Sequence, residues 1–225
     1  MASRFLAVLM ILPAAGALAH GVSAADAAFV QAGGGVQFLP FLYLGAKHMV
    51  TGYDHLLFLA GVIFFLTDLR HVVLYATLFA VGHSVTLLGG VLFHIRADAH
   101  LVDALIGLSV AYKAFENLGG FRASGIAIDT RAAVLAFGLV HGFGLATKLQ
   151  ELELSARGLA TNLVGFNVGV EIGQVLALAL MVLLLQLWRT TRSFDRLAVP
   201  ANVAILSAGF LLAGYQLAAY TFERG

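Results

Sequence analysis

The stretch KHMVTGYDHLLF, residues 47–58, places charge and imidazole inside an apolar part of the chain. Lys47, His48, Asp54 and His55 lie close together here, and the chain then continues into leucine and phenylalanine. Ionisable groups that are removed from water cost free energy unless they are paired, hydrogen-bonded or bound to a metal. The stretch therefore predicts a polar functional site within an apolar fold.

The composition around this stretch is typical of a polytopic membrane protein. The chain has 225 residues, of which 60% are hydrophobic and 11% charged, and its mean hydropathy is +0.93. A soluble domain is usually about 25% charged, so we expect the lipid bilayer to be the main partner. A net charge of +1 without a basic block predicts no nucleic-acid partner, and no nucleotide-binding motif is present.

The absence of cysteine limits the chemistry that the chain can carry out. Without cysteine, disulfides, thiolate metal sites and thiol nucleophiles are excluded. The eight histidines must therefore supply any metal or acid–base chemistry.

The N-terminus predicts a cleavable signal peptide over residues 1–19, or up to residue 25 if the second small-residue site is used. Arg4 precedes a short apolar core, and Ala17-Leu18-Ala19 fits a cleavage site. Residues 20–36 would then form a short exported linker. If cleavage falls before His20, its free amine and imidazole offer an additional, weaker metal site.

Six apolar segments follow, each long enough to cross a bilayer, which takes about 20 residues. They predict an all-α membrane helix bundle of six transmembrane helices in a single unit over residues 37–222. The segments are about 38–66, 71–93, 100–118, 131–149, 159–188 and 201–222.

Two of these segments are longer than the bilayer core requires. A helix of about 29 residues measures about 43 Å, against a core of about 30 Å, so the first and fifth segments must tilt, protrude or break. Gly52 favours a break in the first segment. Gly165, Gly169 and Gly173 recur at four-residue spacing in the fifth segment, which favours a helix-packing face.

The distribution of basic residues predicts a multi-pass membrane protein with both termini on the periplasmic or exterior side. Cytoplasmic loops carry an excess of Lys and Arg, and an exported N-terminus gives six inner against four outer basic residues. The inner ones are Arg70, Arg122, Arg131, Arg189, Arg192 and Arg196, and the outer ones are Arg96, Lys148, Arg157 and Arg224.

Ionisable and amide side chains recur at one depth of the predicted bundle, which favours a common site because such groups are rare inside spans. The predicted metal ligands are His48, Asp54, His55, His83, His141 and Glu171. The predicted neighbouring or pathway residues are Thr51, Ser84, Glu116, Asn117, Asn167 and Gln174. Asn167, Glu171 and Gln174 follow an i, i+4, i+7 pattern, which predicts one inward-facing stripe.

The spacing within the opening stretch restricts how it can bind an ion. His48 and His55 are seven residues apart and share a helix face, but seven residues rise about 10 Å. Ligand atoms lie only about 2 Å from a transition metal. Either the helix unwinds near Gly52 or the two histidines serve successive sites.

The donor types indicate which ions fit. Imidazole and carboxylate without sulfur suit divalent nickel, cobalt, zinc or copper. The simpler alternative is a set of buried histidines hydrogen-bonded to carbonyls, Asp54 and Glu171. At the inner end of the third segment, Lys113 and Glu116 fit an ion pair one turn apart, and Glu116-Asn117 could instead form an inner exit.

Five motifs, taken in order, resemble the HupE/UreJ family of bacterial membrane proteins, in particular its HupE/UreJ-like second branch. The similarity spans about residues 37–190. The motifs are KHMVTGYDHLLFL (47–59), VGHSVTL (81–87), AFENL (114–118), FGLVHGFGLA (137–146) and FNVGVEIGQ (166–174).

The resemblance implies a secondary permease for nickel or cobalt, often associated with the metal supply of hydrogenase or urease. It also implies that His48, Asp54 and His55 form an H-x5-D-H signature similar to the H-x4-D-H element of nickel/cobalt permeases. His83, His141 and Glu171 fall on the other polar motif positions. Nickel-type members carry two His-Gly pairs followed by Glu, whereas VHGFGLATK, residues 140–148, keeps one pair without a nearby acid.

The sequence therefore predicts an inner-membrane permease for a divalent transition metal, most of all nickel or cobalt. The ion would be the substrate, with no permanently bound cofactor, and would pass from the opening stretch through His83, His141 and Glu171 toward Glu116. One alternative is an intramembrane zinc hydrolase that uses the histidines, Asp54 and Ser84. Another is a metal-binding sensor or assembly factor. The sequence leaves open whether the bundle forms a homo-oligomer.

Overall fold

The computed structural model describes residues 35–151 and 157–223. All regular secondary structure within these residues is helical. The predicted signal peptide, His20 and nearly all of the predicted linker lie outside the described residues. An all-helical fold is the outcome that the apolar composition predicts.

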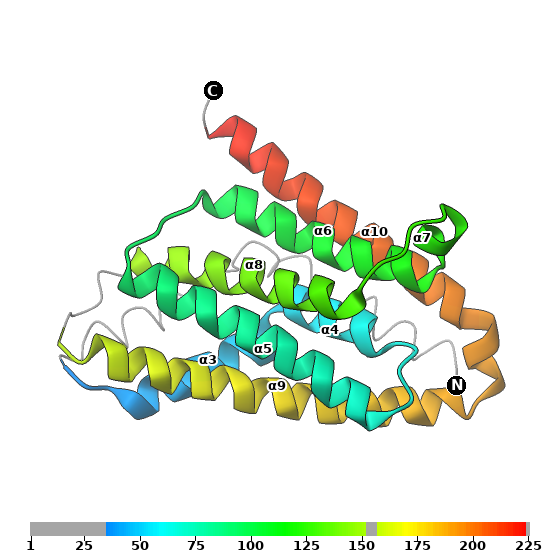
Figure 1. Cartoon of the computed structure of the whole chain (residues 1–225), viewed down its shortest axis with the longest axis horizontal. Coiled ribbons are helices and arrows are strands. Elements are labelled where there is room, and N and C mark those ends of the chain that lie inside the picture. Colours follow the sequence, from blue (N-terminus) through cyan, green and yellow to red (C-terminus); the bar gives the residue numbers. More distant parts are fainter. Residues whose placement is uncertain (1–34, 152–156, 224–225) are drawn as a thin grey trace.

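The long helices run back and forth along one axis, so that their ends gather at two opposite ends of the bundle (Figure 1). The helices are α3 (Phe38–Thr51), α4 (Tyr53–Ile63), α5 (Leu69–Leu92), α6 (Ala99–Asn117), the short α7 (Gly120–Ala123), α8 (Thr130–Gln150), α9 (Leu159–Arg189) and α10 (Arg192–Phe222).

Four of these helices, α5, α8, α9 and α10, are long and apolar enough to cross a membrane. Within the described residues, α3 and α4 are too short, and α6 carries three charged side chains, to be classed by themselves as long and apolar enough to cross a membrane. Many large apolar side chains point outward, which suits a lipid environment. Examples are Leu39, Val73, Leu105, Leu180 and Leu211.

Glycines set the distance between helices that pack in pairs. At Gly169 of α9 a Cβ atom would overlap the carbonyl of Leu42 in α3, which confirms that the glycines of the fifth predicted segment form a packing face. Gly138 of α8 meets the backbone of Phe79 in α5 in the same way. The third pair, α6 and α10, meets at two further glycines, Gly107 and Gly209.

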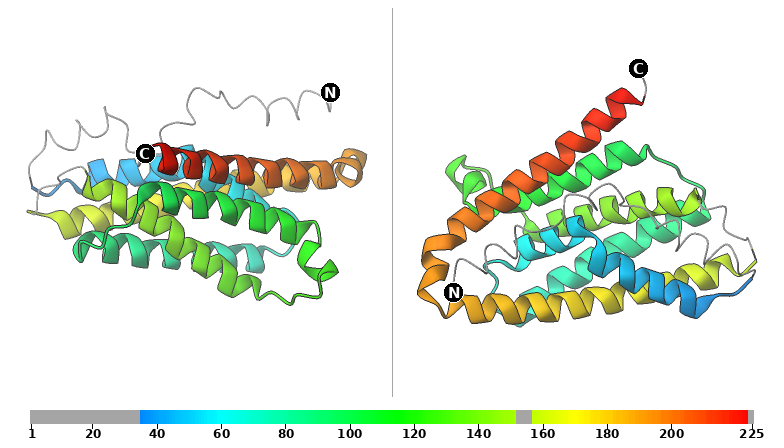
Figure 2. Two further views of the ribbon diagram at one scale, coloured as in Figure 1. Left: turned by 90° about the horizontal axis from the view of Figure 1, so that it is seen from above. Right: turned by 180° about the vertical axis from the view of Figure 1, so that it is seen from behind.

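The short helix α4 lies in the middle of the bundle, between these pairs (Figures 1 and 2). At the C-terminal end of α4, the Arg189 guanidinium donates hydrogen bonds of 2.6–2.8 Å to the carbonyl oxygens of Ile63, Phe64 and Leu66. Since the last carbonyls of a helix lack intrahelical partners, Arg189 stabilises this end of α4.

Two features differ from what segment lengths alone suggest. Helix α9 is continuous over its 31 residues, so the fifth predicted segment does not break. Helix α10 begins at Arg192 and contains Pro200, whereas the apolar pattern predicts a start at residue 201. The first turns of α10 are polar, so a search for apolar segments does not detect them. The helix accommodates proline at the cost of one backbone hydrogen bond.

We predict that Gly169→Ala destabilises the protein, because its methyl group would overlap the Leu42 carbonyl. Overpacking of this kind costs about 1–3 kcal/mol. Gly214→Ala is the matched control, since nothing lies within 4 Å of a Cβ atom there and alanine favours a helix over glycine by about 0.5–1 kcal/mol. Thermal unfolding in detergent measures both, and equal melting temperatures for the two variants would contradict glycine-dependent packing.

Candidate metal centre

The first predicted span is interrupted at Gly52, between α3 and α4. Gly52 has φ −72° and ψ 101°, an extended conformation that any residue adopts. Glycine is needed here for space, because a Cβ atom would lie 2.9 Å from His55 Nδ1 and 3.1 Å from the His48 carbonyl oxygen. Of the outcomes that the sequence left open for this long segment, the structure shows a break at Gly52.

The break brings together two histidines that a straight helix would separate. The ring centroids of His48 and His55 lie 5.0 Å apart, about half the rise of about 10 Å that seven helical residues would impose. Of the two arrangements that the spacing allows, the structure adopts the unwound one.

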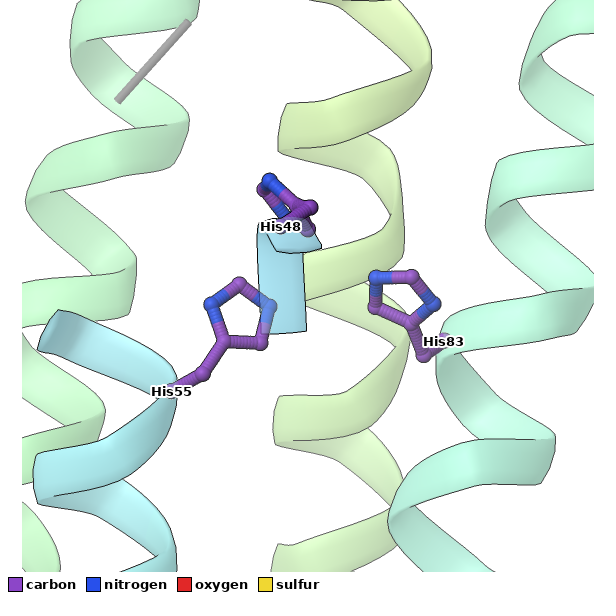
Figure 3. A group of neighbouring side chains, drawn as sticks. All are labelled: His48, His55 and His83. Atoms are coloured by element: carbon purple, nitrogen blue, oxygen red, sulfur yellow. The ribbon is translucent and has the colours of Figure 1, made fainter. Parts of the chain in front are cut away.

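Two further helices add one histidine each. The His55 ring centroid lies 5.8 Å from that of His83 on α5 and 4.9 Å from that of His141 on α8. One nitrogen from each of His48, His55 and His83 lies within 4.8 Å of the other two, and their rings surround a common space (Figure 3). The structure thus gathers all four predicted histidines.

Hydrogen bonds orient two of the rings. Asp54 Oδ1 accepts from the His55 backbone N–H at 2.9 Å and lies 3.0 Å from His55 Nδ1. His141 Nδ1 lies 2.7 Å from the carbonyl oxygen of Phe137, which can only accept, so Nδ1 must donate. In both neutral rings the lone pair then resides on Nε2, the arrangement typical of metal-binding histidines.

Several nitrogens of the centre are buried without a hydrogen bond. Within the part of the chain that the structure describes, His55 Nε2 and both ring nitrogens of His83 have no partner, and the two residues are only 3% and 1% exposed. Buried polar atoms are nearly always satisfied, because an unsatisfied one costs free energy. These nitrogens therefore point to a ligand.

Aromatic rings enclose the centre and limit access of water. Phe79 lies 5.0 Å from His141 and Phe58 lies 5.4 Å from the same ring, measured between centroids. Phe166 of α9 lies 6.1 Å from His48. All three phenylalanines are almost fully buried, so an ion held here would be largely dehydrated and would depend on protein donors.

The nitrogen positions can be compared with the requirements of a single ion. Two imidazoles that bind one ion at about 2.1 Å have nitrogens at most about 4.2 Å apart. The separation of up to 4.8 Å therefore requires only a small inward movement of the rings. Asp54, which is 4% exposed, supplies negative charge beside them.

A small cavity adjoins the histidines. It measures about 10 Å³, the space of about one water molecule. Four of the predicted ligands line it, His48, Asp54, His55 and His141, together with Asp103, Ile106, Gly144, Leu145 and Lys148.

Glu171 does not lie with the histidines. It is exposed on α9, whereas Asn167 and Gln174 are buried. At about 100° per residue the three side chains spread over about 60° of the helix circumference, and Glu171 falls on the outward edge. The predicted polar stripe therefore straddles the boundary between interior and surface.

The other residues predicted beside the site have mainly structural contacts. Thr51 is exposed and donates to the Lys47 carbonyl, and Ser84 is half-buried. Gln174 donates to the Ala76 carbonyl at 2.8 Å and so joins α9 to α5. The Asn167 side chain donates to the carbonyl four residues earlier in its own helix.

The residues predicted as an inner exit join helices instead. Glu116 accepts from Lys113 at 2.8 Å and from Thr130 at 2.6 Å. Asn117 donates to the Gly61 carbonyl of α4 and to Asn202 of α10. These contacts favour the ion-pair interpretation of Lys113 and Glu116.

Three residues of the cavity region escape prediction from the sequence, namely Asp103, Lys148 and Gln216. Lys148 Nζ lies 2.7 Å from Asp103 Oδ2, and Asp103 and Gln216 line a small cavity that also includes Asp54. The signal was an acid near the start of the predicted segment 100–118 and a lysine at the end of segment 131–149. Only the fold shows that they meet.

Comparison with known proteins identifies one family. The family model described as HupE / UreJ protein matches residues 24–224, which is most of the chain. No curated protein and no solved structure gives a significant match.

We predict that Gly52→Ala weakens metal binding, because the added methyl group would displace the His55 ring or Asp54. Disturbing the groups that orient ligands costs about 10–100-fold in metal affinity. Titration of the purified protein with Co²⁺, followed by its absorption bands, measures the change. Gly89→Ala on α5 is the control, since its nearest neighbour would lie 4.0 Å away. Unchanged affinity in Gly52→Ala would show that the break does not position the donors.

Proposed function

The chain belongs to the HupE/UreJ family, and on this premise we propose that it is a secondary permease of the bacterial inner membrane. Its substrate is a divalent transition metal ion, with nickel and cobalt as the leading candidates. The observation that carries the proposal is the four-histidine centre at the interruption of the first span. The ion is the substrate, and no resident cofactor is required.

The donor set supports a divalent ion of intermediate softness. The centre offers imidazole nitrogens and the Asp54 carboxylate, without sulfur, which suits nickel, cobalt, zinc or copper(II). A single carboxylate beside neutral rings binds a dication without the deep charge trap that several acids would create. An ion in transit has to leave again, so moderate affinity suits a carrier.

The broken span supports transport in particular. Transporters commonly hold substrate where a membrane helix is interrupted, because half-helix ends there present backbone groups to the ion. Here the C-terminal end of α3 and the N-terminal end of α4 meet at Gly52, beside His48 and His55.

The proposal counts α3 and α4 as one interrupted span, which with α5, α6, α8, α9 and α10 makes six. Both ends of the chain would then face the periplasm. The ion would enter from the bundle end where α6 begins and α8 ends, bind the histidine centre, and leave toward the opposite end. Glu171 has no part in this route, because it lies on the outer face of α9.

The decisive measurement is uptake of Ni²⁺, Co²⁺, Zn²⁺ and Cu²⁺ by proteoliposomes. We expect His55→Ala and His141→Ala each to reduce uptake of the transported ion at least about tenfold, since loss of groups at a metal site costs about 10–100-fold. His71→Ala is the matched control, because His71 is exposed near the start of α5 and pairs with Asp68. Uptake unaffected in both site variants would refute the proposal.

The same preparations separate the other functions. A zinc hydrolase would retain stoichiometric zinc through purification and would lose its activity in Ser84→Ala, whereas a permease tolerates that change. A sensor or assembly factor would bind the ion with normal affinity and show no flux. Either result would replace the permease proposal.

A further inference from the structure

A buried ion pair lies between the histidine centre and one end of the bundle. Lys148 of α8 donates to both carboxylate oxygens of Asp103 on α6, at 2.7 and 3.0 Å. The two side chains are only 15% and 9% exposed. Removing a lysine and an aspartate from water is costly, and a buried pair is a poor source of net stability. The pair therefore calls for a reason other than stability.

The pair shares a cavity with the predicted metal ligands. One cavity is lined by Asp103 and Lys148 together with His48, Asp54, His55 and His141. A second is lined by Asp54, Asp103 and Gln216. Asp54 and Asp103 thus line both small cavities, and Lys148 supplies a cation to the one that they share with the histidines.

A line of polar contacts continues from the pair to the end of the bundle. Gln216 Nε2 on α10 lies 3.4 Å from Asp103 Oδ2, and Gln216 Oε1 lies 2.7 Å from His100 Nδ1. His100 Nε2 in turn lies 3.1 Å from Glu223, which is 69% exposed. Polar groups therefore connect exposed residues at this end of the bundle with the cavity.

We propose that Asp103 is the carboxylate that first binds the metal ion entering from this end of the bundle. Lys148 is its counter-ion and occupies the position of the metal ion until the ion enters. The proposal rests on the transport function proposed above. When a dication reaches the cavity, Asp103 exchanges the Lys148 ammonium for the ion and passes the ion to Asp54 and the histidines. Without the ion, the ammonium keeps the carboxylate paired.

This role has an electrostatic signature that a simple connection between α6 and α8 lacks. Removing the Asp103 charge leaves a cation in the cavity and should weaken dication binding. Removing the Lys148 charge leaves an extra anion and should strengthen it. A purely structural pair predicts that both changes destabilise the protein, with no opposite effects on affinity.

The test is titration of the purified full-length protein with Co²⁺ in detergent. We expect Asp103→Asn to raise the Kd about tenfold and Lys148→Gln to lower it about tenfold, because a unit charge beside a dication in a partly buried site is worth about a factor of ten or more. The double variant Asp103→Asn/Lys148→Gln should return close to wild type. Lys113→Gln is the control, since it removes a buried lysine whose ion pair lies at the other end of α6.

The outcomes separate this inference from the function on which it rests. If neither the wild type nor His83→Ala binds Co²⁺, or both bind it equally, the metal centre itself is wrong. If His83→Ala loses binding while the Asp103 and Lys148 variants move in the same direction or not at all, only the exchange role fails. If Asp103→Asn does not fold, a lower Kd in Lys148→Gln and an unchanged one in Lys148→Arg support the role, and any other pair of values overturns it.

Discussion

Close contact between helix backbones at glycine is the constraint on which the rest of this structure depends. Gly169 against Leu42, Gly138 against Phe79 and Gly209 against Ala111 leave no room for a side chain between the paired helices. In a lipid environment, where the hydrophobic effect does not drive helices together, such contacts supply much of the packing energy. They also fix how close the rings carried by neighbouring helices can come.

The histidine centre is a direct consequence of this packing. A Cβ atom at Gly142 would overlap the His83 carbonyl, so α5 and α8 are in close backbone contact where each carries a histidine. The interruption at Gly52 then turns α4 inward, so that His55 reaches both of these rings. Two kinds of glycine therefore build the centre, one by allowing helices to approach and one by leaving space at a break.

The charged groups fall into two classes once the fold is known. Lys113 and Glu116, together with Asn117, join α4, α6, α8 and α10 at one end of the bundle. Asp103 and Lys148 instead border the cavity of the histidine centre, where a charge acts on any ion that the centre binds. The two lysine–carboxylate pairs are of similar length, 2.8 and 2.7 Å, but only the second lies beside this cavity.

The sequence by itself determined the helical membrane class, the family, the four histidines and the alternatives at Gly52, because composition, periodicity and local spacing are properties of the chain. Only the tertiary structure decided which alternative holds, since a break depends on the space around Gly52. It also placed Glu171 at the exposed edge of α9, because an i, i+4, i+7 stripe does not say which edge of a helix is covered. The ion pair of Asp103 with Lys148 joins two helices across 45 residues of sequence, so no local sequence pattern predicts it.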